Sequence, residues 1–185
     1  MTRSTGTLLN AAKVDFAIRG AEERCNGDPA RRLGEEGRFQ QSVMENLAVL
    51  QQYNVTKVIA QCPHCFNTLG KEYPEFGATF EVVHHTQLLE TLMAANRLPL
   101  KEGKPIQVTY HDSCYLMRHN GIADAPRNVL KKANNGLPVL EMVQNREQGL
   151  CCGAGGANMW FEVKQEKERI NVIRAKQASD TGADT

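Results

Sequence analysis

The sequence has no long run of apolar residues and almost no net charge. Its longest apolar runs are short, such as Val58-Ile59-Ala60, and none approaches the roughly 20 residues that cross a bilayer as a helix. The 22 lysines and arginines nearly balance the 21 aspartates and glutamates, which leaves a formal net charge of +1. A chain without a basic excess gives no general reason to expect nucleic acid or an anionic membrane surface as a partner.

The N-terminal residues also lack the apolar segment of an export signal. Only Leu8 and Leu9 follow the polar start before Asn10, which is too short for the apolar core of a signal peptide. We therefore expect a cytoplasmic protein, whose thiols stay reduced and serve metal or redox chemistry rather than structural disulfides. With 185 residues, of which 41% are hydrophobic and 23% charged, the chain has the composition of a soluble globular protein.

All six cysteines fall into two patterns that share one spacing. In the first pattern, 36 residues separate Cys25 of Cys25-Asn26-Gly27 from Cys62 of Cys62-Pro63-His64-Cys65. In the second, 36 residues separate Cys114 from Cys151 of Cys151-Cys152-Gly153. Several thiolates that converge at one point are the ligands of iron–sulfur clusters, which is the leading interpretation. The Cys-x-x-Cys motif taken alone is also typical of half a zinc site or of a thioredoxin-like pair.

Glycines follow the paired cysteines of the second pattern. Gly153, Gly155 and Gly156 lack side chains, so the backbone there is able to approach a bulky cluster and donate N–H groups to its sulfurs. The segment lacks the lysine of a phosphate-binding loop, which argues against a nucleotide site. These glycines therefore favour the metal interpretation.

Short strands alternate with helical segments along the chain. Strands are predicted at 14–18, 57–60, 80–83, 106–110 and 138–142, and helices from Asp28-Pro29 onward and over 39–53, 86–96, 125–133 and 157–178. The exposed face of the last helix is predicted to carry Glu162, Lys164, Glu166 and Lys167. This alternation predicts an α/β fold with short, mainly parallel sheets flanked by helices. In such folds ligands bind where strands end and helices begin, and the cysteines of both patterns fall at such positions.

Other polar residues near the cysteines have competing explanations. His84-His85 is a candidate metal pair, but neighbours on a strand point to opposite faces, so at most one is expected to face a given site. The alternative is that one of them caps the following helix or lines the cluster pocket. His111-Asp112 has the composition of an acid–base pair, with turn and cap hydrogen bonds beside Cys114 as the alternative. Three arginines either balance the charge of a cluster or are simply solvated: Arg31, Arg32 and Arg118.

The second cysteine pattern resembles the cysteine-rich CCG domain family, in which a single cysteine, a Cys-Cys-Gly motif and a Cys-x-x-Cys motif follow one another at similar spacings. Cys114, Cys151, Cys152 and Gly153 match the first two elements. The segments 111–116 and 152–156 are also similar to the family. It includes the B and D subunits of heterodisulfide reductase, the iron–sulfur subunits of glycolate and lactate oxidoreductases, and membrane-linked oxidoreductases that take electrons from electron-transfer flavoprotein.

The first pattern is similar to a variant unit of the same family. Asn26 stands where the B subunit of heterodisulfide reductase has a second cysteine. The resemblance therefore implies a [4Fe-4S] cluster held by Cys25, Cys62, Cys65 and one further cysteine. At Cys114, Cys151 and Cys152 it implies a cluster of the non-cubane type, with zinc as the lesser alternative for either site.

The order of the motifs divides the chain between two units. Residues 1–100 are interpreted as the second part of a first CCG-like unit, and residues 101–185 as the first part of a second. We therefore expect two related lobes, each with an incomplete set of cysteines.

For function, the resemblance implies an iron–sulfur electron-transfer module of an oxidoreductase. Such a module relays electrons from a flavoprotein or ferredoxin-type subunit to a quinone, heme or disulfide acceptor. A membrane heme or quinone-reactive domain, at the inner face of the membrane, is expected outside this chain. One alternative is a heterodisulfide or disulfide reductase, with Cys152 as the candidate catalytic residue, and another is a zinc-stabilised binding module without redox activity.

Overall fold

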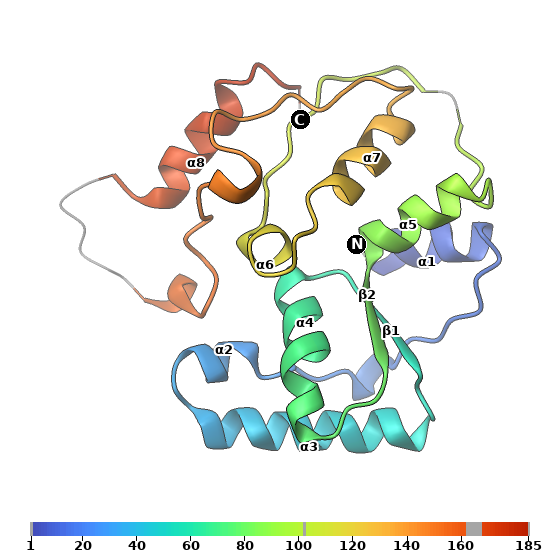
Figure 1. Cartoon of the computed structure of the whole chain (residues 1–185), viewed down its shortest axis with the longest axis vertical. Helices are drawn as coiled ribbons and strands as arrows, with labels where there is room; N and C mark the ends of the chain where they lie inside the picture. Colours follow the sequence, from blue (N-terminus) through green and yellow to red (C-terminus); the bar gives the residue numbers. More distant parts are fainter. Residues whose placement is uncertain (1, 102, 162–167, 185) are drawn as a thin grey trace.

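The computed structural model describes residues 2–101, 103–161 and 168–184, and has eight α-helices and two strands within those ranges. The helices are α1 (Thr2–Ala11), α2 (Asp28–Arg32), α3 (Glu36–Gln52), α4 (Pro63–Asn67), α5 (His85–Ala94), α6 (Cys114–Met117), α7 (Asp124–Ala133) and α8 (Ile170–Ser179), and the strands are β1 (Lys57–Ala60) and β2 (Glu81–His84) (Figure 1). None of these helices is both long and apolar enough to cross a membrane.

The sheet is parallel, as predicted. Strand β1 pairs with β2 in a register that places Lys57 opposite Glu81 and Ala60 opposite His84. The prediction for 57–60 is confirmed residue for residue, and that for 80–83 is off by one. The segments predicted as strands at 106–110 and 138–142 meet only at one parallel bridge, between Thr109 and Leu140. The α/β class is therefore confirmed, with a smaller sheet than the pattern indicated.

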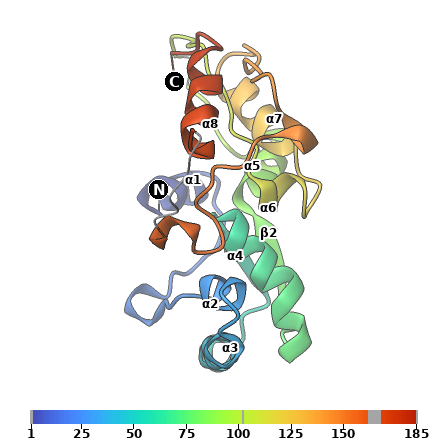
Figure 2. The ribbon, with the colours of Figure 1, turned by 90° about the vertical axis from the view of Figure 1, so that its left-hand side faces the viewer.

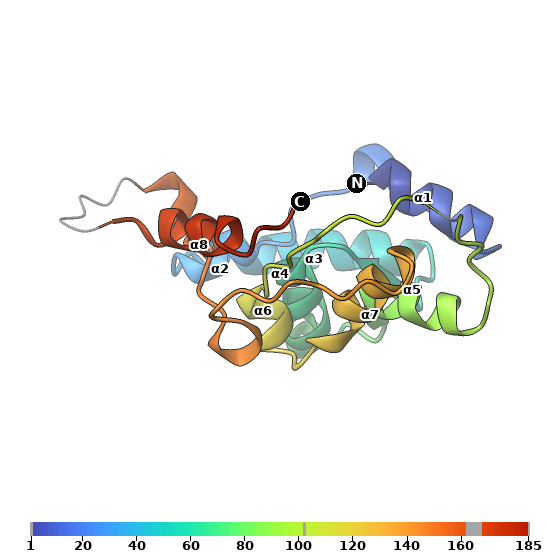
Figure 3. The ribbon, with the colours of Figure 1, turned by 90° about the horizontal axis from the view of Figure 1, so that it is seen from above.

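The elements are spread along the long axis of the molecule, though not in sequence order, because α1 lies beside α5 (Figure 1). Helices α2 and α3 lie at one end, α7 and α8 at the other, and β1, β2 and α4 lie between them (Figures 1 and 2). From above, α1 and α5 share one side of the molecule, opposite α8 (Figure 3). The connection between the two strands runs through α4, a π-helical turn (Thr68–Glu72) and a 3-10 turn (Tyr73–Phe76).

Two small hydrophobic cores hold these elements together. Helix α3 buries the apolar stripe that its sequence predicts, since Phe39, Val43, Leu47 and Leu50 are all at most 6% exposed, and it packs on Tyr73. The second core joins α1 to α5 and to the segment that follows α5, through these buried residues: Leu9, Ala12, Leu89, Leu92, Met93 and Leu98. Burial of apolar side chains, rather than sheet pairing, therefore provides most of the packing.

Two predicted elements are wrong. Residues 14–18 form no strand; Val14 and Phe16 pack against the α1–α5 core while Ile18 is exposed. The helix predicted over 157–178 is interrupted, because Ala157 has a left-handed backbone (φ 70°) and Phe161 is extended. Within the described parts of this range, 157–161 and 168–178, a 3-10 turn, Asn158–Trp160, and α8 are helical. The four charged residues assigned to its exposed face, Glu162, Lys164, Glu166 and Lys167, lie outside the described residues.

A buried ion pair anchors the segment that leads to Cys114. The Arg127 guanidinium donates to both Asp112 oxygens, at 2.7 and 2.8 Å, and to both Glu141 oxygens at the same distances. The Asp112 side chain is only 1% exposed and also accepts the Arg146 backbone N–H at 2.7 Å. Burial opposes ionisation, but the hydrogen bonds from Arg127 and the Arg146 N–H, together with the charges of Arg127 and Arg174, outweigh it and lower the pKa of Asp112. The carboxylate is thus ionised, buried and fully used.

We expect Arg127→Met to destabilise the chain by about 3–5 kcal/mol, because it leaves the buried Asp112 charge without its partner. Arg24 is the matched control, since its pair with Glu45 is exposed on both sides and Arg24→Met should cost less than about 1 kcal/mol. Urea unfolding of both variants measures the difference. Equal losses would show that the Asp112–Arg127 pair carries no special weight.

Candidate metal centre

Cys62 lies where strand β1 ends and helix α4 begins. It is the N-cap of α4 and has an extended backbone (φ −87°, ψ 127°), two residues after the end of β1. Pro63 occupies the first helical position, where a missing backbone N–H breaks no helical hydrogen bond. Cys65 lies in the same turn, so the helix start presents both thiols together.

The two thiols of this turn have opposite acidities. A hydrogen bond from the Cys65 thiol, opposed by burial and aided by the backbone N–H groups of Cys65 and His64, lowers the pKa of Cys62 to about 5. The same bond to Cys62, together with burial and the charges of Cys62 and Cys25, raises the pKa of Cys65. Cys62 is therefore a thiolate near neutral pH, and thiolates are the form that binds metal.

Cys25 is held in place by two buried polar side chains. Asn46 on α3 donates to the Cys25 carbonyl at 3.0 Å, and the Tyr73 hydroxyl donates to the Asn26 carbonyl at 3.0 Å. The Gly27 N–H then donates back to the Cys25 sulfur at 3.5 Å. This turn requires a left-handed backbone at Gly27 (φ 85°), which glycine adopts without strain.

The second cysteine pattern repeats this local geometry. The Gly153 N–H donates to the Cys151 sulfur at 3.4 Å, and Gly153 is again left-handed (φ 75°). A Cβ at Gly153 would lie 2.5 Å from the Ile170 side chain, so α8 packs directly on this turn. The two Cys-x-Gly turns therefore share a left-handed glycine and an N–H···S hydrogen bond, although they lie in different halves of the chain.

Cys114 is the first residue of α6 and lies beside Cys151. Burial, and then the Cys151 sulfur, raise the pKa of Cys114, while a hydrogen bond from Arg118 partly opposes them. The structure thus brings Cys62 next to Cys65 and Cys114 next to Cys151. Cys152 is exposed, as are Cys25 and Cys62, and all six cysteines are free thiols.

Three observations show how far these residues fit a thiolate-ligated cluster. Soft thiolates are paired in each pattern, and backbone N–H groups already point to two of the sulfurs. The Asn26 side chain is buried with its Oδ1 used by the Asp28 N–H at 3.1 Å, and its Nδ2 is buried without a partner in the described chain. Among residues 2–101, 103–161 and 168–184, however, no three His, Cys, Asp or Glu side chains are close enough to hold one metal ion. The donors suit a cluster, and each pattern needs further convergence to complete a site.

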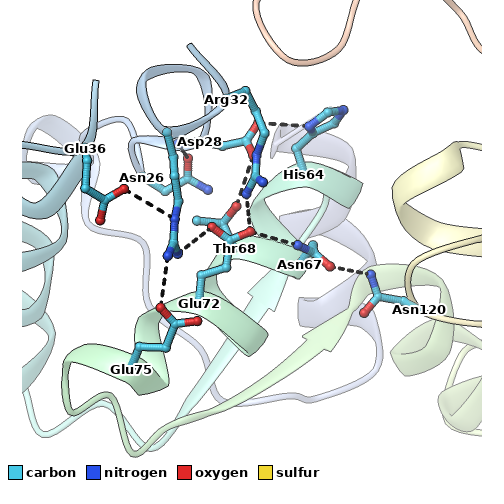
Figure 4. Close-up of polar contacts among 11 residues, drawn as sticks. Asn26, Asp28, Arg32, Glu36, His64, Asn67, Thr68, Glu72, Glu75 and Asn120 are labelled. Atoms are coloured by element: carbon cyan, nitrogen blue, oxygen red, sulfur yellow. Dashed lines mark hydrogen bonds and ion pairs between the residues drawn. The ribbon is translucent and has the colours of Figure 1, made fainter. Parts of the chain in front are cut away.

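A buried carboxylate organises the residues around the first pattern (Figure 4). Asp28 accepts hydrogen bonds from His64 Nδ1 (2.9 Å), Arg32 Nε (3.0 Å) and Thr68 Oγ1 (3.3 Å). Burial would raise the pKa of Asp28, but the bonds from His64 and Arg32 outweigh it and lower that pKa. The bond to Asp28 in turn raises the pKa of His64 against the effect of burial.

This network extends from α2 to the turn after α6. Arg31 and Arg32 both bind Glu72, and Arg31 also binds Glu75 at 3.0 Å. Asn67 donates to Glu72 at 3.2 Å and accepts from Asn120 at 3.1 Å, as Figure 4 shows. Arg31 and Arg32 are therefore paired with carboxylates rather than simply solvated.

His64 also joins the two cysteine patterns directly. Its ring lies against that of Tyr115, the residue after Cys114, with centroids 4.0 Å apart and planes 31° apart. A Cβ at Gly155 would lie 2.8 Å from His64 Cε1 and 2.9 Å from Nε2. The ring thus fills the space that the missing side chain of Gly155 leaves.

His84 is the N-cap residue of α5, in line with one of the two alternatives for this pair, but two other expectations for the histidines are wrong. His84 and His85 do not point to opposite faces, since their ring centroids are 4.4 Å apart. His84 ends β2 and His85 begins α5, so the alternation of a strand does not extend across them. His111 and Asp112 form no acid–base pair with each other: His111 Nδ1 accepts from Arg174 at 2.9 Å, and Asp112 binds Arg127.

Several residues that shape the site have weak sequence signals or none. Asn46 falls within the apolar stripe of α3, three residues after Val43. Since a buried polar side chain is expected to have a hydrogen-bond partner, its position could have predicted a contact with a neighbouring segment. The Asp28–His64 bond and the His64–Tyr115 contact join residues that lie far apart in the sequence. No local periodicity carries that information.

Comparison with known proteins places the cysteines in a family context. The profile described as "Cysteine-rich domain" (CCG) matches residues 1–70 and 108–185. The chain is 46% identical over 177 residues to "EtfAB:quinone oxidoreductase" of Syntrophomonas wolfei, which covers 96% of this chain and 24% of that protein. It is 43% identical over 175 residues to "Probable iron-sulfur-binding oxidoreductase FadF" of Bacillus subtilis, with coverage of 95% and 24%.

A third relative is named for a heterodisulfide. The chain is 36% identical over 198 residues to the D subunit of "Dihydromethanophenazine:CoB--CoM heterodisulfide reductase" of Methanosarcina barkeri, which covers 98% of this chain and 45% of that protein. The chain therefore spans about a quarter of the first two relatives and less than half of the third. No solved structure is significantly similar to it.

The acidity of Cys62 has a measurable consequence in the cluster-free chain. We expect the rate of Cys62 alkylation by iodoacetamide to rise with a midpoint near pH 5 rather than near the ordinary 9.0 of a thiol, because only the thiolate reacts. Cys65→Ala should move the midpoint upward, since it removes the main hydrogen bond to the Cys62 sulfur. Peptide mass spectrometry over a pH series measures both.

Cys114→Ala is the control for this experiment. It removes a thiol of the other pattern and leaves every partner of Cys62 in place, so the midpoint should not move. A wild-type midpoint close to 9 would contradict the lowered pKa of Cys62.

Proposed function

Because this chain belongs to the cysteine-rich CCG domain family, we propose that it is an iron–sulfur electron-transfer module of an oxidoreductase. The profile covers both cysteine patterns, and the relatives named above are oxidoreductases or their subunits. When bound, the cluster supplies one-electron chemistry, and the protein supplies thiolate ligands, burial and hydrogen bonds to sulfur.

The observation that carries the proposal is the repeated Cys-x-Gly turn. In both patterns a left-handed glycine donates its N–H to the sulfur two residues before it. Such donors stabilise negative charge on sulfur, which favours the thiolate and raises the reduction potential of a cluster that it ligates. A structural thiol in a hydrophobic core has no use for this arrangement.

The proposed ligands are the six cysteines, in two groups. Cys25, Cys62 and Cys65 form the first group, and Cys114, Cys151 and Cys152, with the Gly153 N–H, form the second. The first group suits a [4Fe-4S] cluster completed by one further cysteine, because Asn26 stands where a second thiolate would be. The second keeps both adjacent cysteines and suits a non-cubane cluster. In this proposal residues 1–100 and 101–185 are parts of two CCG units.

The electron partners follow from the chemistry that the relatives' names state. Those names include a quinone and a heterodisulfide, so we assign the acceptor to one of these classes or to heme. The donor is a flavoprotein or ferredoxin-type subunit. A reduced cytoplasmic setting fits six free thiols, with contact to the inner face of a membrane supplied by other domains or subunits.

One observation favours a second function, reduction of a disulfide at the second group. Cys152 is exposed, whereas Asn26, its counterpart in the first group, is only 8% exposed. An exposed sulfur at this position is accessible to a substrate disulfide. Turnover of a disulfide with a reduced viologen as donor, abolished in Cys152→Ser, would support this second function over electron relay alone.

Metal content tests the leading proposal. After anaerobic reconstitution with iron and sulfide, we expect iron and acid-labile sulfide in near-equal amounts, and loss of at least one cluster's share in Cys62→Ser or in Cys114→Ser. Ser113→Ala is the control, because it changes the neighbour of Cys114 but removes no thiolate. The Ser113 side chain makes no cap hydrogen bond to α6, so its loss should not disturb the helix. Zinc without sulfide in the purified chain would contradict the iron–sulfur assignment.

A further inference from the structure

His64 is the side chain between Cys62 and Cys65 that reaches the second cysteine group. Its ring has three different partners. Nδ1 donates to the buried Asp28 carboxylate at 2.9 Å, one face lies on Tyr115, and the Cε1–Nε2 edge fills the space beside Gly155. The ring orientation is therefore fixed from three sides.

Two of these partners, Tyr115 and Gly155, lie in the two segments that carry the cysteines of the second group. Tyr115 follows Cys114 directly on α6, and Gly155 lies two residues after Gly153 in the Cys151–Gly153 turn. The residue after Gly155 lies close to Arg32, another hydrogen-bond partner of Asp28, since a Cβ at Gly156 would lie 3.5 Å from Arg32 Cβ. A movement of the His64 ring thus reaches both segments that carry the thiols of the second group.

His64 is connected just as directly to the cysteines of the first group. His64 lies between two cysteines of one helical turn, and its backbone N–H contributes a hydrogen bond to the Cys62 sulfur. A metal centre that draws Cys62 and Cys65 onto itself also fixes the backbone of His64. The position of the ring then depends on whether the first group is filled.

We propose that His64, oriented by Asp28, couples the two cysteine groups, so that assembly of a cluster at one group favours assembly at the other. This inference rests on the proposed function for the clusters themselves, but the contact that transmits the effect is present in the cluster-free chain. His64 acts here as a positioning residue and not as a ligand. Coupling between binding sites is reciprocal, and common magnitudes are about 5- to 150-fold in affinity.

A double-mutant cycle on the reconstituted chain tests the coupling. Cys62→Ser/Cys65→Ser empties the first group, and in the wild-type background it should reduce assembly at the second group by at least about fivefold. His64→Ala alone should cause a similar reduction. Adding Cys62→Ser/Cys65→Ser to His64→Ala should then have no further effect on the second group. The readout is the iron-dependent absorbance and electron paramagnetic resonance signal of the second cluster against iron concentration.

Full additivity in this cycle would overturn the proposal, because it would mean that the groups assemble independently. His119→Ala is the matched control. His119 stacks on Tyr115 from another position, at 4.5 Å between centroids, and contacts neither Asp28 nor Gly155 among the described residues. It should leave the coupling unchanged, and a loss equal to that of His64→Ala would show that general disruption of the aromatic contacts is the cause.

A second cycle uses the cluster-free chain and needs no metal. Gly155 has an ordinary backbone conformation, so Gly155→Ala introduces no backbone strain and acts only through the 2.8 Å contact with His64. We expect it to speed alkylation of Cys151, which is only partly exposed, by at least about fivefold. In a His64→Ala background the extra methyl group has room, and Gly155→Ala should have no effect. His64→Phe, which keeps a ring on Tyr115 and loses the Asp28 bond, provides an intermediate case if His64→Ala unfolds.

Gly37→Ala is the control for backbone substitution, because nothing lies within 4 Å of a Cβ at that position. It should leave alkylation unchanged. If Gly155→Ala is equally silent in the wild-type background, the His64 contact transmits nothing and the proposal is wrong. If the chain binds no iron–sulfur cluster at all, the proposed function fails, while this second cycle still decides whether His64 links the two cysteine groups.

Discussion

The Asp28 carboxylate is the constraint on which the arrangement of the cysteines depends. A buried charge is tolerated only when its hydrogen-bonding capacity is filled, and Asp28 fills it with donors from three places: Arg32, His64 and Thr68. Those donors come from α2, from α4 and from the π-helical turn that follows it. One carboxylate therefore fixes the position of the Cys25 turn relative to the start of α4.

A duplicated turn serves two different surroundings. At both cysteine patterns the glycine N–H meets a sulfur, yet the residue between them is buried Asn26 in one and exposed Cys152 in the other. Asn26 Oδ1 accepts a hydrogen bond from the Asp28 N–H, so the buried Asn26 side chain connects this turn to the start of α2. The same kind of turn therefore carries a buried amide in one pattern and a solvent-exposed thiol in the other, because its middle residue differs.

Local patterns predicted both paired strands and the helices α2, α3, α5 and α7 to within a few residues, but not the contacts between distant segments. Strand β1 and helix α3 were predictable because each carries enough apolar residues at the period of its own structure. The helix expected over 157–178 was not, since Ala157 adopts a left-handed backbone that its sequence does not signal. The cysteines and their grouping were readable from spacing. The Asp28–His64 bond and the His64–Tyr115 contact were not, because they arise only when distant segments pack together.

The arginines of α2 show what pairing removes from a surface. Arg31 and Arg32 face Asp28, Glu36, Glu72 and Glu75, so their positive charges are met within the chain. Four carboxylates surround these two guanidinium groups, so the cluster is net negative, and the ions of ordinary buffers screen its field within about 10 Å. A basic partner surface would therefore meet this face more often at low ionic strength than at high ionic strength.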